Sequence, residues 1–515
     1  MIIRDRYAPS PTGLQHIGGI RTALFNYLFA KSLKANGEGK FILRLEDTDR
    51  TRFDECYVQN LYDTFEWLCL KWDEGPDCGG ASAPYIQSER TAHYKKYAQE
   101  LLDKGQAYYC FCSSERIDEV RKQREAAHSS ESGYDRLCRS IDSAEAAKRA
   151  SNGEACTVRL KIPLGETTVF KDHLLGDIEW KNDDVNPDPV LLKSDGFPTY
   201  HLANVVDDHL MEITHVLRAQ EWLASTPLHV IMYRAFGWTP PEFCHLPMVM
   251  GQDGKKLSKR HGATSIDEFR KAGYLPAALI NYVALLGASY EEGKEIYTLD
   301  ELAERFSLEK LNKAPAVFDY KKLEWYNGQY IRMMSDEELA RLCLPYAKKS
   351  RIFSRQDAKL AKDAKEEERE EDPSENQRKL FIASMALVKE RLVFLNEVPE
   401  KVAYLFKEPD VPAAEEFIPK KCDLAKTIEL MQIGLELVRT MAQAANDEDA
   451  ENFIKAQAEE RNVKLGDLMM PLRVAITGSR VSPPLFGSLR ILGADKSEER
   501  VKKALDFLDK NAKTS

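Results

Sequence analysis

The sequence has few cysteines, no long hydrophobic run and no excess of positive charge. Ten cysteines in 515 residues are too sparse for a disulfide framework, so we expect reduced thiols in a cytoplasmic protein. The longest uncharged stretch covers the 17 residues 274–290 and contains Pro276 and Asn281, which favours a buried helix over a membrane span. The N-terminal segment also lacks the apolar core of a signal peptide.

Charge and composition exclude further classes of protein. The 83 acidic and 73 basic residues give a net charge of −10, which argues against a protein that coats nucleic acid without specificity but leaves room for a local basic groove. A hydrophobic fraction of 43% excludes a disordered chain, and 27 glycines with 23 prolines exclude a collagen-like one. The length predicts roughly three or four domains of about 150 residues each.

The start of the chain predicts a strand, a helix and a second strand. Ile2 and Ile3 open a short strand, and the turn-rich segment at residues 8–13 follows. Apolar residues then recur at helical spacing between residues 20 and 28, and residues 41–49 again favour a strand. This βαβ order is typical of a parallel sheet whose carboxyl edge carries functional loops.

Two later regions differ in character. Residues 95–195 contain three close cysteines and strand-like pieces at 157–162, 167–172 and 189–194, and we interpret them as an insertion. The strand–helix–strand style returns at 198–222, so we predict a doubly wound α/β domain that the insertion splits.

Beyond about residue 325 the pattern is helical, for example at 381–395 and 424–444. Residues 357–372 hold twelve charged residues in sixteen, which indicates a solvated helix or surface insertion.

Two short segments have the chemistry of phosphate binding. The first, APSPTGLQHIGG at residues 8–19, lies between a predicted strand and a predicted helix. Gly18 and Gly19 let a phosphate approach the backbone, and His16 can donate to a phosphate oxygen. The second, KKLSKR at residues 255–260, carries four positive charges after a Gly-flanked turn, which suits a departing pyrophosphate. Taken alone, the first segment is better explained as a turn with a surface histidine, and the second as a solvated basic loop.

Together the segments resemble the HIGH and KMSKS signatures of class I aminoacyl-tRNA synthetases. Further stretches resemble the bacterial glutamyl-tRNA synthetases, and they are RYAPSPTG (6–13), LRLEDTDRTR (43–52), PTYHLANVVDDHLM (198–211), VLRAQEW (216–222) and LRVAITGSRVSPPL (472–485). The fourth signature position is Gly19 instead of His, and KLSKR has Leu257 for Met and Arg260 for Ser.

The resemblance implies a fold and a reaction. It implies a Rossmann-type catalytic domain that is split by an α+β insertion. An all-α C-terminal anticodon-binding region follows this domain. The expected domains are 1–95 and 198–245 for the two catalytic halves, 96–197 for the acceptor-binding insertion, 246–325 for the stem-contact domain and 326–515 for the helical region. The implied reaction joins L-glutamate to tRNA(Glu) in two steps through glutamyl-adenylate and uses ATP and Mg²⁺. The resemblance also implies a monomeric protein that does not bind a membrane.

Site residues also follow from the resemblance. The implied catalytic residues are His16, Gly18 and Lys259. The implied ATP-binding residues are His16, Gly18, Gly19, Glu221, Lys256, Ser258 and Lys259. The implied glutamate-binding residues are Arg6, Ala8, Ser10, Glu46, Tyr200, Asn204 and Arg218. An arginine fork fits a carboxylate, and an unpaired buried arginine makes glutamine costly to admit by roughly 2–5 kcal/mol.

Cys110, Cys112 and Cys138 have the only site-like cysteine spacing. Spacing alone leaves two interpretations open, three reduced core cysteines or a zinc site with His128 as fourth ligand. The resemblance implies instead a structural Zn²⁺ held by these cysteines and Tyr134, because some glutamyl-tRNA synthetases have Cys-x-Cys followed by Tyr-x-x-x-Cys.

Other activities compete with this interpretation. A non-catalytic tRNA-binding relative would lack His16 or Lys259, and both are present. A short relative that glutamylates a modified nucleoside lacks the C-terminal region, and glutaminyl-tRNA synthetase carries β-barrels there. The sequence does not decide whether tRNA(Gln) is charged as well.

Overall fold

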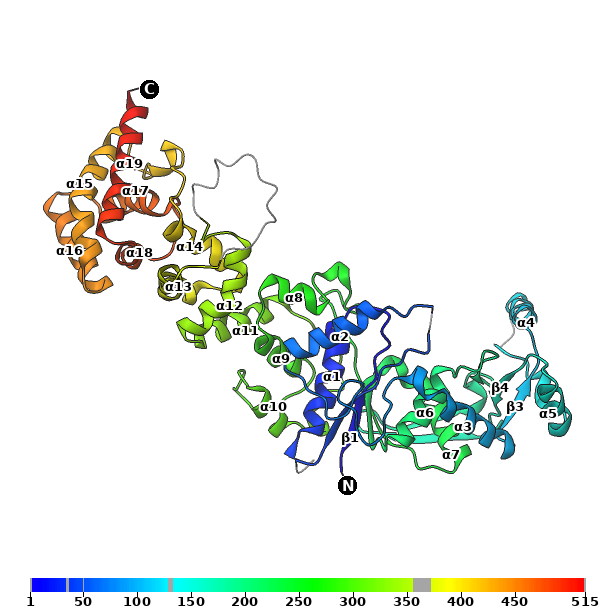
Figure 1. The fold of residues 1–515 in the computed structure, drawn as a ribbon. Helices are drawn as coiled ribbons and strands as arrows, with labels where there is room; N and C mark the ends of the chain where they lie inside the picture. The colour runs from blue at the N-terminus through cyan, green and yellow to red at the C-terminus, as the bar shows by residue number, and fades with distance from the viewer. Residues whose placement is uncertain (1, 34–36, 50, 128–132, 355–371, 514–515) are drawn as a thin grey trace. The chain divides into compact units, whose positions relative to one another are not determined.

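The computed structural model describes residues 2–33, 37–49, 51–127, 133–354 and 372–513. The chain divides into two compact units (Figure 1). The first comprises Met1–Arg270 with Pro276–Tyr320, and the second comprises Lys271–Leu275 with Lys321–Ser515. The predicted charged segment at residues 357–372 lies outside the described residues except for its last one.

The first unit opens with the predicted βαβ arrangement. Strands β1 (Arg4–Tyr7) and β2 (Lys40–Leu43) are parallel, with Arg4 opposite Lys40, and helix α1 (Ile17–Ala30) connects them. β1 begins after Ile2 and Ile3, where we predicted the first strand to start. β2 ends well before residue 49, the predicted end of the second strand. The buried face of α1 includes Leu24 and Phe25, which explains the helical spacing of its apolar residues.

The strand–helix–strand pattern that follows the predicted insertion also corresponds to parallel strands. β8 (His215–Ala219) and β9 (Glu242–Leu246) pair in register, and the N–H of Thr214 donates to the Arg4 carbonyl at 2.8 Å beside β1. β1 and β2 are thus parallel to each other, and so are β8 and β9, and the two pairs are neighbours. We therefore expect functional loops at their carboxyl ends.

One hairpin of the predicted insertion belongs to the same sheet as β8 and β9. β5 (Thr167–Asp172) and β6 (Gly176–Lys181) fall within the predicted insertion, but they extend the β8–β9 sheet in the order β6-β5-β9-β8. The remaining sheet of the insertion has the order β3-β4-β7. Its strands are β3 (Ala107–Cys110), β4 (Thr157–Leu160) and β7 (Val190–Leu192). Period-two alternation identifies a strand but does not identify its partner.

Helices and two short strands complete the first unit. The helices are α2 (Glu55–Trp67), α3 (Thr91–Asp103), α4 (Ser114–Ala126), α5 (Ser143–Ser151), α6 (Tyr200–Leu210), α7 (Thr226–Phe236), α9 (Pro276–Leu285) and α10 (Leu299–Arg305). The short parallel pair is β10 (Val249–Met250) and β11 (Ala316–Val317). Helix α9 is buried, as expected for the uncharged stretch. Among the described residues, no helix has the length and apolarity needed to cross a membrane.

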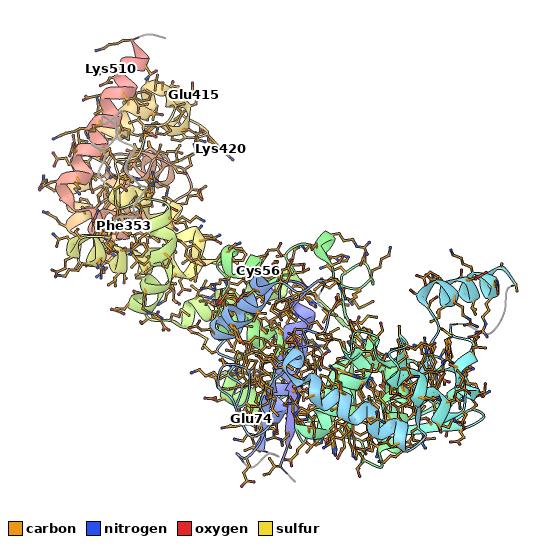
Figure 2. All side chains as sticks on the ribbon, turned by 45° about the vertical axis from the view of Figure 1, so that its right-hand side comes forward. Cys56, Glu74, Phe353, Glu415, Lys420 and Lys510 are labelled. Carbon is orange, nitrogen blue, oxygen red and sulfur yellow. The ribbon has the colours of Figure 1, made fainter. Side chains whose placement is uncertain are left out.

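The second unit is helical in the described residues. Two helices, α8 (Ile266–Ala272) and α11 (Tyr320–Met333), begin in the first unit and end in the second. The others are α12 (Asp336–Lys349), α13 (Glu375–Val388), α14 (Val398–Phe406), α15 (Leu424–Gln443), α16 (Asp447–Glu460), α17 (Leu465–Thr477), α18 (Leu485–Leu492) and α19 (Ala494–Ala512). Phe353, which is labelled in Figure 2, packs edge-on against Phe381 and Phe406, and Phe417 is also buried. Phe381 and Phe417 are therefore core residues rather than exposed platforms for bases.

Candidate active site

A cavity of about 800 Å³ lies where the carboxyl ends of β1, β2, β8 and β9 meet. Every residue that the sequence assigned to ATP or glutamate lines it. These residues are Arg6, Ala8, Ser10, His16, Gly18, Gly19, Glu46, Tyr200, Asn204, Arg218, Glu221, Lys256, Ser258 and Lys259. The geometry thus brings together residues that are more than 200 positions apart in the chain.

His16 occupies the N-cap of α1. Its Nδ1 accepts a hydrogen bond from the Gly19 N–H at 3.2 Å, which satisfies one of the free amides at the helix start. Desolvation lowers the pKa of His16, and the positive charge of Lys256 lowers it further. The ring is therefore neutral at pH 7 with its proton on Nε2, so that Nε2 is a donor for an anionic oxygen.

Gly18 and Gly19 allow close approach at the same helix start. A Cβ atom on Gly18 would lie 3.3 Å from the His16 ring, and one on Gly19 would lie 2.9 Å from the Tyr7 hydroxyl. The amides of this first turn carry the positive end of the helix dipole. The turn therefore has both the space and the electrostatic character of a phosphate site.

Backbone hydrogen bonds join the two signature segments. The Ile17 N–H donates to the Thr264 carbonyl at 3.1 Å, and the Ile266 N–H donates to the Gln15 carbonyl at 3.0 Å. The segment that follows KLSKR is thus attached directly to the start of α1. This contact fixes both segments on one wall of the cavity.

The basic loop carries its lysines at the cavity edge. Lys256 Nζ lies 2.6 Å from Glu221 Oε2, and both side chains are exposed. Lys259 lines the cavity from the short 3₁₀ turn Lys259–His261. Asp253 accepts hydrogen bonds from Arg260 and faces His261 Nε2 at 3.0 Å, which holds the base of the loop.

A buried network of alternating charges forms the floor. Arg6 donates through Nε and Nη2 to both carboxylate oxygens of Asp208, at 3.0 and 3.1 Å. Arg44 donates to Asp208 Oδ1 at 2.6 Å and to Glu46 Oε1 at 3.0 Å. Burial raises the pKa of Glu46, whereas for Asp208 the two arginines outweigh burial and lower the pKa. Two arginines therefore balance two carboxylates in this network.

Arg218 differs from Arg6 because no carboxylate pairs with it in the described part of the chain. It is 6% exposed, and its Nη1 donates to the Tyr200 hydroxyl at 3.2 Å. Its Nη2 donates to the Thr226 hydroxyl at 2.7 Å and to the Trp222 carbonyl at 3.2 Å. The cavity thus contains a buried guanidinium held by neutral groups, which is a site for a carboxylate.

The remaining predicted residues surround this guanidinium and the loop after β1. The Tyr200 ring lies 4.6 Å from the Trp222 ring and forms one wall, and Asn204 is buried one turn further along α6. Ala8 and Ser10 lie on the loop after β1, where they line the cavity. Sequence reasoning alone gave no reason to choose Tyr200 over other aromatic residues.

Two important residues were missed, Arg44 and Asp208. Both are almost fully buried and link Arg6 to Glu46. A signal was present in the sequence, since Arg44 interrupts an otherwise apolar strand and Asp208 lies on the buried face of α6. A charge at a position whose neighbours predict burial requires a charged partner.

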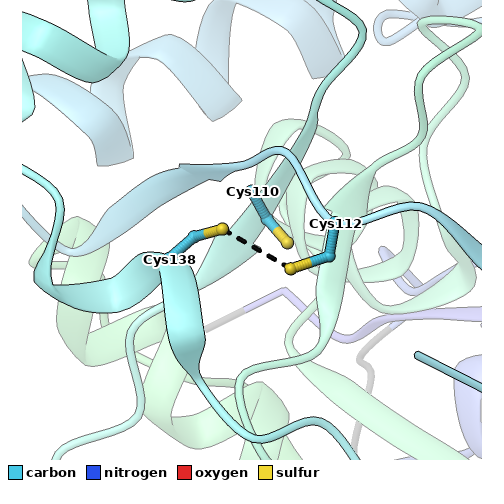
Figure 3. A group of neighbouring side chains, drawn as sticks. All are labelled: Cys110, Cys112 and Cys138. Atoms are coloured by element: carbon cyan, nitrogen blue, oxygen red, sulfur yellow. Dashed lines mark hydrogen bonds between the residues drawn. The ribbon is translucent and has the colours of Figure 1, made fainter. Parts of the chain in front are cut away.

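Cys110, Cys112 and Cys138 form a cluster in the predicted insertion (Figure 3), and none of them lines the cavity. Cys110 ends β3, and the Cys112 and Cys138 sulfurs are 3.6 Å apart. The Tyr134 hydroxyl lies 3.3 Å from the Cys110 sulfur and 3.7 Å from that of Cys112. All ten cysteines are free thiols. His128, the alternative fourth ligand, lies outside the described residues.

Comparison with known families agrees with the architecture. Residues 2–325 match the model for the catalytic domain of class I tRNA synthetases (E and Q). Residues 338–505 match an anticodon binding domain. The chain belongs to the class I tRNA synthetase family for glutamate and glutamine. Its catalytic α/β domain followed by a helical anticodon-binding domain confirms the fold class predicted from the sequence.

Individual members of this synthetase family are similar over their full length. A glutamate–tRNA ligase of Treponema denticola is 57% identical over 508 residues, covering 98% of this chain and 99% of the relative. One from Treponema pallidum is 52% identical and covers 97% of each chain. A crystal structure of a glutamate tRNA ligase from Elizabethkingia meningosepticum in complex with its amino acid superposes with a TM-score of 0.84 at 34% identity, and the match covers 99% of this chain and 100% of that one.

Proposed function

We propose that this chain attaches L-glutamate to tRNA(Glu) at the expense of ATP, which is the activity of a glutamate–tRNA ligase. The observation that carries the proposal is the unpaired, buried Arg218 in the same cavity as the His16 and Lys259 segments. An amino-acid carboxylate site and a nucleotide-phosphate site then share one enclosed space. The names of the full-length relatives agree with this activity.

The first step joins the α-carboxylate of glutamate to the α-phosphate of ATP and releases pyrophosphate. The reaction needs no protein nucleophile, so the residues contribute position and charge. His16 Nε2 donates to a phosphate oxygen, the amides of Gly18 and Gly19 face the phosphates, and Lys259 compensates the charge that develops on the departing pyrophosphate. The 3′-terminal ribose hydroxyl of the tRNA then attacks the activated carbonyl and releases AMP.

Mg²⁺ is expected to arrive with the nucleotide. Among the described residues that line the cavity, the acids are Glu46 and Glu221, which are bonded to Arg44 and Lys256. They do not form the carboxylate cage that a resident ion needs. Lys256 has to release Glu221 or share it when the phosphates bind.

Glutamate is selected at both of its ends. Arg218 and the Tyr200 hydroxyl are placed to receive the side-chain carboxylate, and Arg6 contributes from its pair with Asp208. Glu46 faces the cavity and is suited to the α-ammonium, whose positive charge favours the ionised form of this carboxyl. Ala8, Ser10 and Asn204 complete the pocket walls.

We also propose that the cysteine cluster holds a structural Zn²⁺. Tetrahedral coordination with Zn–S distances of about 2.3 Å needs sulfurs roughly 3.8 Å apart. The 3.6 Å between Cys112 and Cys138 fits this value, and the Tyr134 hydroxyl supplies the fourth donor beside Cys110. Burial raises the pKa of the Cys112 thiol to about 11, so Zn²⁺ would have to displace its proton on binding. Such an ion would hold β3 and the segment around Cys138 together.

The remaining proposals concern organisation. We propose the domain limits 1–95, 96–197, 198–245, 246–325 and 326–515, with tRNA contacts in the last two and in the insertion. The match of residues 338–505 to an anticodon binding domain supports the last of these. We further propose a monomer in the cytoplasm.

Charging assays with purified tRNA test the function. Protein with ATP and Mg²⁺ should attach radiolabelled glutamate to tRNA(Glu), and pyrophosphate exchange should depend on added tRNA. Failure to form glutamyl-tRNA would contradict the proposal and favour a non-catalytic tRNA-binding relative. The same assay with tRNA(Gln) and with labelled glutamine tells whether the enzyme also charges the second tRNA.

A further inference from the structure

The buried guanidinium of Arg218 is oriented by a histidine that does not itself line the cavity. Arg218 Nε donates to His245 Nε2 at 3.1 Å. His245 is the fourth residue of β9 and is fully buried. Since Nη2 is bonded to Thr226, these two contacts fix the plane of the guanidinium and leave Nη1 toward Tyr200.

Asp172 determines which nitrogen of His245 carries the proton. Its Oδ2 lies 2.7 Å from His245 Nδ1, and it also accepts the His245 backbone N–H at 3.0 Å. Burial alone would raise the pKa of Asp172, but hydrogen bonds from His245 and from the N–H groups of Leu174 and Leu175 lower it. The carboxylate is therefore ionised and needs a donor, so the proton lies on Nδ1 and the lone pair on Nε2.

His245 is also neutral. Burial lowers its pKa, and the bond to Asp172 offsets this only in part. Another neighbour of Arg218, His229, has a pKa well below its usual value for the same reason, first burial and then the charge of Arg218. The groups around Arg218 thus accept hydrogen bonds without neutralising its charge.

We propose that His245, held by Asp172, is a positioning residue that presents Arg218 to the side-chain carboxylate of glutamate. The proposal rests on the proposed role of Arg218 in binding that carboxylate. An acidic residue in place of the neutral acceptors would hold the guanidinium equally well, but it would cancel the charge that distinguishes glutamate from glutamine. The neutral acceptors therefore fix the orientation of the Arg218 guanidinium and leave its charge uncompensated.

Variants of His245 test the orientation. His245→Leu removes the acceptor, and we expect KM for glutamate to rise by about tenfold or more while kcat changes by less than about threefold. His245→Gln restores a neutral acceptor and should return KM to within about threefold of the wild-type value. His215→Leu is a matched control, because His215 is a similarly buried histidine at the opposite end of the neighbouring strand β8. Its glutamate KM should not change.

Variants of Thr226 test the charge of Arg218. The Thr226 hydroxyl also lies 3.0 Å from His245 Nε2, so both variants lose this contact and only the charge differs between them. Thr226→Asp places a carboxylate beside Arg218, and we expect the ratio of kcat/KM for glutamate to that for glutamine to fall by about tenfold or more. Thr226→Asn has nearly the same size without the charge, and it should change this ratio by less than about threefold. If His245→Leu does not fold, this pair still tests whether the uncompensated charge of Arg218 sets the preference.

Three results would overturn the proposal. They are an unchanged glutamate KM in folded His245→Leu, a His245→Gln variant as impaired as His245→Leu at equal Tm, and equal glutamate preference in Thr226→Asp and Thr226→Asn. Wild-type protein that attaches no glutamate would refute the proposed function itself. Wild-type charging together with either of the first two results refutes only the orienting role of His245, and together with the third result it refutes the role of the uncompensated Arg218 charge.

Discussion

The hydroxyl of Tyr7 lies 2.9 Å from the point where a Cβ atom at position 19 would be. The same hydroxyl is bonded to Gln15 Oε1 at 2.9 Å, so it is not free to move away. The class I signature has histidine at this fourth position, and here Tyr7 closes the space that a side chain needs. Glycine is therefore required at position 19 for two reasons. Tyr7 leaves no room for a side chain, and a phosphate has to approach the backbone there.

We expect Gly19→Ala to lower kcat/KM for ATP by about tenfold or more, because the added methyl displaces Tyr7 and the first turn of α1. Tyr7→Phe removes the colliding oxygen. The double variant Tyr7→Phe/Gly19→Ala should recover part of the loss, and steady-state pyrophosphate exchange measures all three proteins. A strictly additive double variant would show that the two positions do not interact.

Lys259→Ala should slow adenylate formation by about 10²–10³ while glutamate affinity changes by less than about threefold. Lys259 is proposed to act on charge that develops in the transition state, so its loss affects rate rather than binding. Single-turnover kinetics and equilibrium dialysis separate the two effects. Lys255→Ala is the control, since Lys255 belongs to the same loop and does not line the cavity. A loss of affinity at unchanged turnover would refute this role.

Arg218→Gln should lower the preference for glutamate over glutamine by at least about thirtyfold, because the charge that penalises the amide is removed. Competition between the two labelled amino acids in one charging reaction measures the ratio. Arg234→Gln provides the comparison, as Arg234 lies at the exposed end of α7. An unchanged ratio would mean that another residue discriminates.

Protein purified without chelator or His-tag should contain close to one zinc per chain. Cys110→Ser/Cys138→Ser removes two of the four proposed ligands and should lose the metal, which elemental analysis measures. Because metal binding and local folding are linked, the double variant should also be cleaved faster by protease in the insertion. The exposed Cys56→Ser should keep its zinc. Less than about 0.2 zinc per wild-type chain, or full occupancy in the double variant, would exclude the site.

Asp5→Asn should raise Tm at neutral pH. Neither oxygen of the Asp5 carboxyl has a hydrogen-bond partner among the described residues, and burial raises its pKa well above the usual value. The unfolded carboxyl ionises above about pH 4 whereas the folded one stays protonated, so stability falls as pH rises through this window. Each pKa unit of the difference corresponds to about 1.4 kcal/mol. A gain in Tm that grows from pH 4 to pH 8 is expected, and a pH-independent difference would contradict the explanation.

The sequence was most informative where structure depends on neighbours in the chain. The spacing of Leu24 and Leu28 predicted α1, and the glycines after His16 predicted a phosphate turn at its start. Both features arise from local geometry, since a helix repeats every few residues and its first amides face outward. The family resemblance was needed to select Tyr200 and Arg218, because side chains of these types are common in cores and on surfaces.

Long-range partners could not be derived in the same way. Arg44 and Asp208 are 164 positions apart, and only the fold shows that they meet. The pairing of β5 with β9 has the same character, because alternation along β5 is compatible with any adjacent sheet. His245 was not selected either, since a histidine in an apolar strand is usually an ordinary core residue.

The loop that carries Lys259 is anchored at both of its ends. At one end Leu257 donates to the Val249 carbonyl at 2.9 Å, and at the other Ile17 donates to Thr264 at 3.1 Å. A chain held at two fixed points has far fewer conformations to lose than a free one when it closes over a ligand. The two anchors therefore limit how far Lys259 can lie from the edge of the cavity that it lines.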